Sequence, residues 1–148
     1  MTVGTMEVTL FGGKGLLSTH LFGRIDPYVV IQYGNEEHIS KIAHGQGSKP
    51  EWNERFKFKV HYPADAGDDN QRKYKLFLQI MDHDRFTRDD YLGQTTIYVK
   101  ELLELGVENG KAELGTQKYR VVLKDGTYYG EIRVGISFST ATGGDDED

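Results

Sequence analysis

Alternation of apolar and polar residues with a period of two recurs along most of this 148-residue chain. Such alternation is typical of strands that have one buried face and one solvated face. The clearest case is residues 55–60, where Phe56, Phe58 and Val60 share one face and three cations share the other. Turn signals rich in glycine, asparagine and aspartate separate the runs. The pattern therefore favours a sheet protein over a helical one.

Eight such runs are predicted to be strands. They cover residues 6–11, 28–33, 38–43, 55–60, 74–81, 92–99, 117–123 and 130–138. One short helix is predicted at residues 100–105, ended by Gly106, and residues 63–72 and 106–115 are predicted to be loops. Eight strands with so little helix predict an all-β fold, an eight-stranded antiparallel β-sandwich.

Composition limits both the architecture and the surroundings of the chain. We expect one domain over residues 1–140 and an acidic, disordered tail over residues 141–148, in which Asp145–Asp148 carry four negative charges of a net −5. Cysteine is absent, which excludes disulfides and thiolate metal sites. No apolar run approaches the ~20 residues of a membrane span. The N-terminal residues match neither a signal peptide nor a myristoylation site, so we expect only peripheral membrane contact.

The sharpest functional feature is an acidic segment that follows the fifth predicted strand and holds Asp82, Asp84 and Asp90. Strand alternation places Asp82 and Asp84 on one side, and Asp90 returns across the loop. Converging carboxylates favour a hard divalent cation such as Ca²⁺, which prefers oxygen ligands. A solvated acidic loop is the alternative. An EF-hand is excluded, because Thr87 and Gly93 stand where that motif needs glycine and glutamate.

A second feature is Asp26 before Pro27, which by itself is an ordinary turn signal. The order Asp-Pro-Tyr-Val, then Lys-Pro-Glu-Trp-Asn-Glu-Arg-Phe at residues 49–56, then Asp-Tyr-Leu-Gly at residues 90–93, resembles the C2 domain family. The resemblance covers residues 6–138 and is strongest to the small single-domain C2 proteins of plants, the elicitor-responsive and phloem type. It implies a C2-type sandwich with the second, circularly permuted topology.

The resemblance also implies a calcium site at the loop tips. Carried over position by position, its ligands are the carboxylates of Asp26, Asp82, Asp84 and Asp90 and the main-chain carbonyls of Thr19 and His83. His20 stands at the position of the family's fifth aspartate. Because imidazole is a poor ligand for a hard cation, we expect weakened binding, with one ion where the family holds two. A calcium-free module, or a site tuned by protonation of His20, stays open as an alternative.

Two further surfaces are candidates for lipid and polyanion binding. Apolar and cationic residues at the loop tips suit shallow membrane insertion and phosphate contact; they are Leu21, Phe22, Arg24, Arg85, Phe86 and Arg88. The alternative is that the phenylalanines fold back over the end of the sandwich. The resemblance implies a phosphoinositide or polyanion patch at Arg55, Lys57 and Lys59, extended by Lys41 and Lys49. An ordinary solvated strand face is the alternative there.

No pattern of an enzyme appears, so the chain is predicted to be a binding module. The leading prediction is calcium-dependent peripheral binding to anionic phospholipid membranes. The alternative is a calcium-independent adaptor that binds proteins, phosphoinositides or RNA through the basic strand face, with RNA suggested by the resemblance alone. We expect a cytoplasmic monomer that is recruited to a membrane, the plasma membrane in particular, in plant defence signalling.

Overall fold

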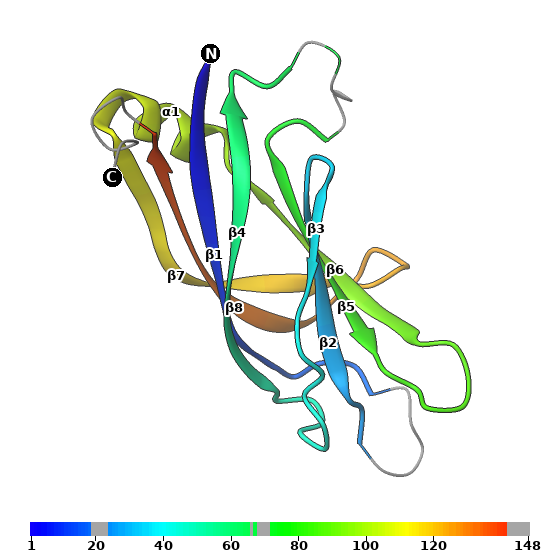
Figure 1. Ribbon diagram of the computed structural model, residues 1–148. Helices are drawn as coiled ribbons and strands as arrows, with labels where there is room; N and C mark the ends of the chain where they lie inside the picture. The colour runs from blue at the N-terminus through cyan, green and yellow to red at the C-terminus, as the bar shows by residue number, and fades with distance from the viewer. Residues whose placement is uncertain (19–23, 66, 68–71, 142–148) are drawn as a thin grey trace.

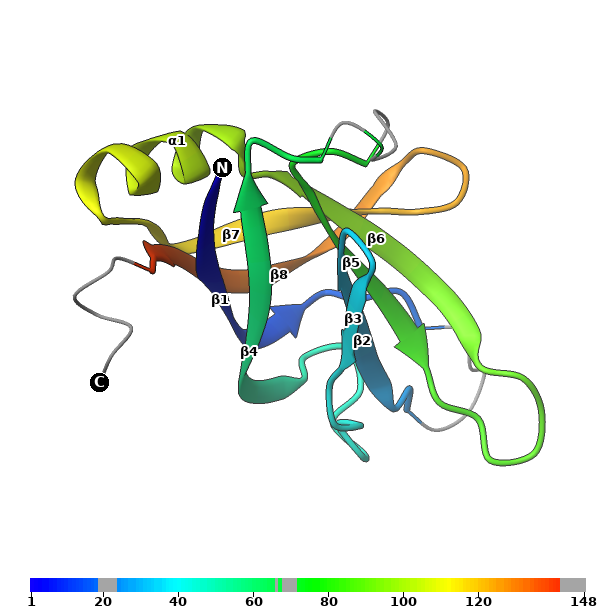
Figure 2. The same cartoon turned by 45° about the horizontal axis from the view of Figure 1, so that its top comes forward.

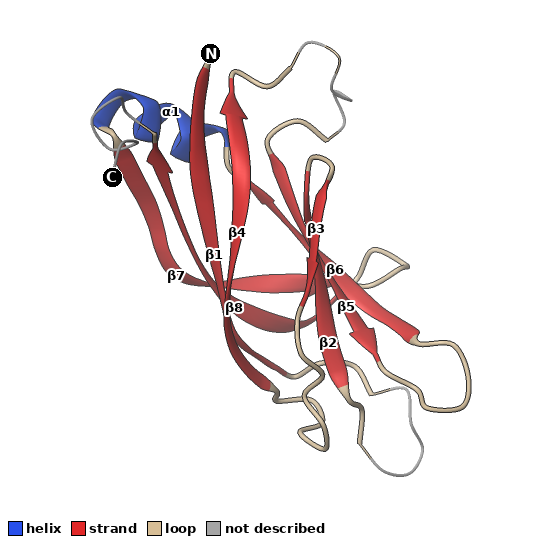
Figure 3. Ribbon diagram, viewed as in Figure 1, coloured by secondary structure: helices blue, strands red, loops and turns tan. Residues whose placement is uncertain are grey.

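The computed structural model describes residues 1–18, 24–65, 67 and 72–141. In this part of the chain it forms eight strands and one helix (Figures 1 and 3). Their bounds are β1 Thr2–Lys14, β2 Pro27–Tyr33, β3 Glu36–Ile39, β4 Glu51–Tyr62, β5 Lys75–Asp82, β6 Asp90–Tyr98, α1 Lys100–Asn109, β7 Lys111–Val122 and β8 Tyr128–Thr140. No helix in the described ranges is long and apolar enough to cross a membrane.

All strand pairings in the described chain are antiparallel, in the order β3-β2-β5-β6-β7-β8-β1-β4. The link between β6 and β7 is a single pair, Gln94 with Val122. The strands therefore divide at that point into two four-stranded layers, β3-β2-β5-β6 and β7-β8-β1-β4 (Figure 2). The predicted eight-stranded antiparallel sandwich is confirmed, whereas the permuted topology stays a prediction.

The core lies between the two layers and is built from the inward residues of each alternating strand. Fully buried side chains include Val8 of β1, Leu78 of β5 and Val134 of β8. Each such side chain contributes about 1.5–3 kcal/mol relative to its exposed state. Trp52 of β4 is also buried, and its indole Nε1 donates to the carbonyl of Pro27 at 3.1 Å. This bond holds the start of β4 against the start of β2, beside the loops of the predicted calcium site.

Strand β4 shows the alternation that the sequence predicts. Phe58 and Val60 are buried, and Phe56 is half-buried against the core. Arg55, Lys57 and Lys59 are exposed on the opposite face. The strand is longer than residues 55–60, because its ladder with β1 continues from Thr2–Tyr62 to Gly12–Glu51.

The prediction of a loop over residues 106–115 is wrong, because α1 continues to Asn109 and β7 begins at Lys111. Gly106 lies inside the helix, where a Cβ atom would come within 2.3 Å of the Phe138 ring. Glycine is needed there for close packing and does not end the helix. The helix ends at Gly110, whose positive φ of 89° suits glycine and whose N–H donates to the Gly106 carbonyl.

The third strand is also misplaced by the sequence, since it covers Glu36–Ile39 in place of residues 38–43. The ladder stops at Ser40 because the hydroxyl of this residue accepts the N–H of Val29 at 2.8 Å. The Ser40 N–H still donates to the Val29 carbonyl at 2.9 Å, but the hydroxyl replaces the Ser40 carbonyl as the acceptor that a continuing strand would supply. The following residues turn back toward β2, where the N–H of Ala43 donates to the Pro27 carbonyl.

Candidate functional site

Three neighbouring strands reach the same end of the sandwich, and each carries an aspartate there. In the register of β2, β5 and β6, Pro27 pairs with Asp82 and Asp82 pairs with Asp90. Asp26 directly precedes Pro27. The β5–β6 loop and the loop over residues 40–50 lie at this end, opposite α1 (Figure 1). The strand ends therefore bring Asp26, Asp82 and Asp90 into one region of the molecule.

The carboxylate of Asp82 is buried and helps to build this end of the fold. Its Oδ1 accepts the N–H of Asp26 at 2.8 Å, and the N–H of His83 donates to the Asp26 carbonyl at 3.0 Å. Asp26 in turn accepts the N–H of Gly45 with its own Oδ1 at 2.7 Å. A buried carboxylate is costly unless polar groups compensate it. These bonds tie β2, β5 and the loop over residues 40–50 together.

Within the β5–β6 loop, Asp84 stabilises a turn. Its Oδ1 accepts the N–H groups of Phe86 and Thr87 at 2.8 and 3.2 Å, the pattern in which an aspartate side chain caps its own loop. The N–H of Asp84 donates to Oδ1 of Asp89 at 2.9 Å. Asp84 therefore forms hydrogen bonds within its own loop.

Asp89 and Tyr28 form a contact that sequence reasoning missed. The Tyr28 hydroxyl donates to Oδ2 of Asp89. The pKa of Asp89 is lowered, mainly by this bond and to a smaller extent by the N–H that Asp84 donates. The pKa of Tyr28 is raised to about 12, mainly by burial and to a smaller extent by the bond to Asp89. The available sequence signal was weak: Asp89 is one of several adjacent aspartates, and Tyr28 follows the Asp-Pro pair.

Only part of the predicted metal site lies within the described residues. Thr19 and His20 lie outside them. Within them, no group of three or more histidine, aspartate or glutamate side chains is arranged to hold a metal ion. The rings of His83 and His44 are perpendicular with their centroids 6.5 Å apart, and Nδ1 of His83 lies 3.5 Å from Oδ1 of Asp89. The carboxylate and carbonyl oxygens at this end fit the chemistry of a hard cation, but the described side chains form no assembled cluster.

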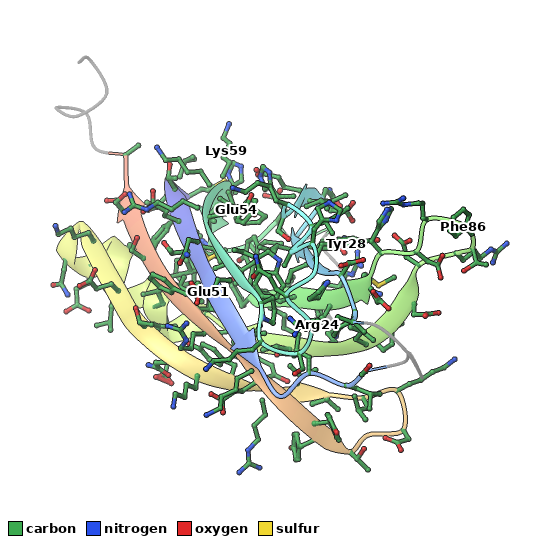
Figure 4. The ribbon with its side chains drawn as sticks, turned by 90° about the horizontal axis from the view of Figure 1, so that it is seen from below. Arg24, Tyr28, Glu51, Glu54, Lys59 and Phe86 are labelled. Carbon is green, nitrogen blue, oxygen red and sulfur yellow. The ribbon has the colours of Figure 1, made fainter. Side chains whose placement is uncertain are left out.

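The tip of the β5–β6 loop carries an exposed aromatic side chain. Phe86 is 89% exposed and projects from the outer end of the loop (Figure 4). Arg85 and Arg88 beside it are also exposed. Arg24 is exposed, and its Nη1 donates to the Gly45 carbonyl at 3.1 Å. The other two predicted lipid-binding residues, Leu21 and Phe22, lie outside the described part of the chain.

The predicted polyanion residues are all exposed, but they do not form one uniform patch. Arg55, Lys57 and Lys59 share a face of β4, where Lys57 pairs across the ladder with Glu7. The N–H of Lys41 donates to Glu54, which lies on β4 itself. Lys49 borders a separate groove, which is also lined by two glutamates and by three cations outside the predicted patch. The three cations are Lys14, Lys118 and Arg133.

The fold is a two-layer antiparallel sandwich whose loops at one end carry both aspartates and arginines. Residues 4–114 match the family model of the C2 domain, and the chain belongs to this family. It is 48% identical over 141 residues to elicitor-responsive protein 1 of Oryza sativa subsp. japonica, covering 93% of this chain and 86% of the relative. It is 44% identical over 140 residues to 16 kDa phloem protein 1 of Arabidopsis thaliana, covering 94% and 86%.

A solved structure agrees with these relatives. The C2 domain-containing protein from a putative elicitor-responsive gene superposes with a TM-score of 0.71 at 33% identity, covering 96% of this chain and 93% of that one. The family and the resemblance to single-domain C2 proteins of plants are therefore confirmed. The names of these relatives describe elicitor response, phloem and the C2 domain, and none is the name of an enzyme.

Proposed function

We propose that this protein docks on anionic phospholipid membranes through the end of the sandwich that carries Asp26, Asp82 and Asp90, in a calcium-dependent manner. One observation carries the proposal: aspartates at three adjacent strand ends lie at the same end of the fold as Phe86, an exposed phenylalanine flanked by two arginines. In a cell, the chain would be cytoplasmic until it is recruited to a membrane surface such as the plasma membrane.

Calcium would supply a positive charge among these carboxylates and free coordination positions for the oxygens of lipid phosphates. The residues that would hold it are Asp26, Asp82, Asp84 and Asp90, with the carbonyls of Thr19 and His83. Asp84 already accepts two N–H groups of its own loop, so a cation competes with an existing turn. His20 supplies no carboxylate where the family has its fifth aspartate. Both features support weak binding, and a His20→Asp variant is expected to bind calcium more tightly.

The exposed side chains of the β5–β6 loop suit contact with the lipid surface. Burying a phenylalanine such as Phe86 contributes about 1.5–3 kcal/mol. Arg85 and Arg88 stand on either side of it and can donate to phosphate oxygens. Apolar insertion and phosphate contact can therefore occur together once calcium reduces the negative charge at this end.

Sedimentation with phosphatidylserine vesicles tests the proposal. In calcium we expect the protein in the pellet, and in chelator we expect it in the supernatant. Phe86→Ser should weaken vesicle binding about tenfold, the equivalent of losing about 1.4 kcal/mol of insertion energy. Leu105→Ser is the matched control, because Leu105 is a half-exposed apolar residue on α1, at the opposite end of the sandwich. It should leave binding unchanged.

Two results would contradict the proposal. Equal recovery in the pellet with calcium and with chelator would exclude calcium dependence. It would favour the adaptor alternative, in which Arg55, Lys57 and Lys59 bind proteins, phosphoinositides or RNA. No vesicle binding in either condition, together with no change of the melting temperature in calcium, would also favour an adaptor. Phosphoinositide binding that survives removal of the charges at Lys57 and Lys59 would exclude the basic strand face as its site.

A further inference from the structure

A groove of about 780 Å³ lies along the seam where the two sheets separate, and the proposed membrane site does not use it. It is lined by residues of β6, of β7 and of the β7–β8 turn, and by Tyr128 at the start of β8. β6 and β7 run in different directions on either side of this seam (Figure 2). All of the lining residues belong to the described part of the chain.

One wall of the groove is the edge of β6 that faces away from β5. β6 pairs with β5 along its length, but with β7 it pairs only at Gln94 and Val122. Beyond that pair the strands diverge, and the hydroxyl of Thr95 reaches across to the carbonyl of Arg120 at 2.9 Å. In an antiparallel arrangement, alternate residues of 95–98 direct their N–H and C=O groups toward the groove. Such an edge can accept an added strand.

The side chains of the groove are aromatic and cationic. Tyr98 and Tyr128 are 69% and 63% exposed, and Arg120 lies 5.1 Å from the centre of the Tyr128 ring. The phenol oxygen of Tyr119 is buried and has no hydrogen-bond partner among the described residues. Tyrosine is enriched in protein interfaces because it combines a large apolar ring with a polar end.

The charge of the lining is of one sign. Arg120 and Lys124 are the two charged side chains of the lining, which includes no aspartate or glutamate. The chain as a whole carries −5, so a cationic, tyrosine-lined groove stands out from the average surface. Complementarity selects an anionic occupant, and the open edge of β6 selects one with an extended backbone.

We propose that this groove binds an extended, acidic peptide segment of a partner protein, which adds as a strand to the open edge of β6. Its carboxylates contact Arg120 and Lys124, and its alternate side chains pack on the tyrosines. The acidic residues 145–148 of the same chain are a poor occupant. They follow Thr140, and β8 spans about 40 Å between Thr140 and Tyr128, whereas eight residues reach at most about 28 Å.

Fluorescence anisotropy with a defined peptide pool tests the proposal. The probe is a pool of labelled decapeptides in which aspartate or glutamate alternates with valine, isoleucine or tyrosine. A pool with lysine at the acidic positions is the reference. We expect saturable binding of the acidic pool and none of the lysine pool. In an added strand, alternate backbone N–H groups face β6. Two N-methylated versions of one acidic peptide, methylated at odd or at even positions, should therefore differ: one should lose binding and the other should keep it.

Paired charge reversals locate the binding surface. Arg120→Glu with Lys124→Glu should weaken binding of the acidic pool at least about tenfold, because two attractive charges become repulsive. Lys111→Glu with Arg133→Glu changes the net charge equally outside the groove and should leave binding unchanged. Tyr98→Ala removes an exposed ring and provides a second test should the reversal unfold the protein. Hydrogen exchange of alternate amides among residues 95–98 should slow when peptide binds.

Several outcomes would overturn the proposal. They are equal binding of the acidic and lysine pools, equal weakening by the two charge reversals, and unchanged hydrogen exchange along β6. If inositol hexakisphosphate displaces the peptide without any slowing of exchange on β6, the cations bind phosphate and not a strand. If a variant truncated after Ala141 binds the pool about tenfold more tightly, the acidic tail of another copy is the occupant.

Discussion

At the scale of single residues, the aspartates at the loop end have structural roles in the fold. Asp82 and Asp26 accept backbone N–H groups from other segments, and Asp84 and Asp89 accept those of the β5–β6 loop. Negative charge is therefore held in place by hydrogen bonds that the protein itself provides. A cation that binds here must compete with these bonds, which is a physical reason to expect low affinity.

The bond between Tyr28 and Asp89 gives a prediction at this scale. In Tyr28→Phe, the pKa of Asp89 should rise, because its main stabilising donor is lost. Because the pKa of Asp89 is lower in the folded protein than the ordinary aspartate value of 3.8, its ionisation stabilises the fold when the pH is above 3.8. This stabilisation is lost as the pH falls through the lowered pKa of the folded state. The variant should therefore melt at a lower temperature than the parent at neutral pH, and the difference should shrink below about pH 4.

Carboxyl chemical shifts followed against pH measure the first effect, and thermal unfolding at several pH values measures the second. Tyr98→Phe is the control, because Tyr98 is largely exposed and lies at the other end of β6. An Asp89 pKa that is the same in Tyr28→Phe and in the parent would contradict this account.

At the scale of elements, the sequence predicts strands well where packing follows the chain and poorly where it depends on distant residues. The alternation of β4 was sufficient to place its buried and cationic faces. The end of α1 was not predictable, because the role of Gly106 depends on Phe138, a residue on another element. The end of β3 was missed for a similar reason, since Ser40 bonds to the backbone of β2.

The sequence prediction of the candidate site was also partial. Asp82 and Asp90 flank the loop between two consecutive predicted strands, and the resemblance to C2 domains added Asp26 to them. Tyr28 and Asp89 are 61 residues apart, and they meet because β2 pairs with β5 and the β5–β6 loop brings Asp89 back to Tyr28.

The edges of the two sheets give a prediction for elements. β3 and β4 are the outermost strands, and side chains of β3 cover the edge of β4. Oε1 of Glu36 accepts the N–H of Lys59 at 3.0 Å, and Nε2 of His38 lies 3.0 Å from the Lys57 carbonyl. Glu36→Ala should expose this edge, so hydrogen exchange at the Lys59 amide should accelerate and the protein should self-associate at high concentration.

Glu37→Ala is the matched control, because Glu37 is an exposed glutamate on the same short strand. Exchange rates by NMR and apparent mass by light scattering provide the readouts. Unchanged exchange at Lys59 in Glu36→Ala would show that the side chain does not protect the edge.

At the scale of the whole molecule, the two sheets share a core, but their strands in the described part of the chain are joined by a single backbone pair, between Gln94 and Val122. This arrangement leaves the seam open, and the cationic groove forms there. The proposed membrane site lies at a strand end and uses different residues. The same architecture can therefore support two surfaces, one for lipid and one for a partner protein, without a conflict between their side chains.

The seam gives the last prediction, because Gly93 lies immediately before its single pair. Gly93 has a φ of 135°, and an added Cβ atom would come within 2.5 Å of Val121 Cγ1 and 3.0 Å of the Val122 carbonyl oxygen. Gly93→Ala should therefore combine backbone strain with a clash that pushes β7 from β6, and should destabilise the protein by at least about 3 kcal/mol.

Gly126→Ala separates these two effects. Gly126 also has a positive φ, of 89°, but a Cβ atom there would have no neighbour within 4 Å, so only strain of about 1–3 kcal/mol is expected. Urea unfolding of both variants measures the difference. Val121→Ala removes one of the clashing atoms. It should therefore destabilise the Gly93→Ala variant less than it destabilises the parent protein. Equal destabilisation by Gly93→Ala and Gly126→Ala would mean that the seam tolerates separation, and that the shared core alone holds the two sheets together.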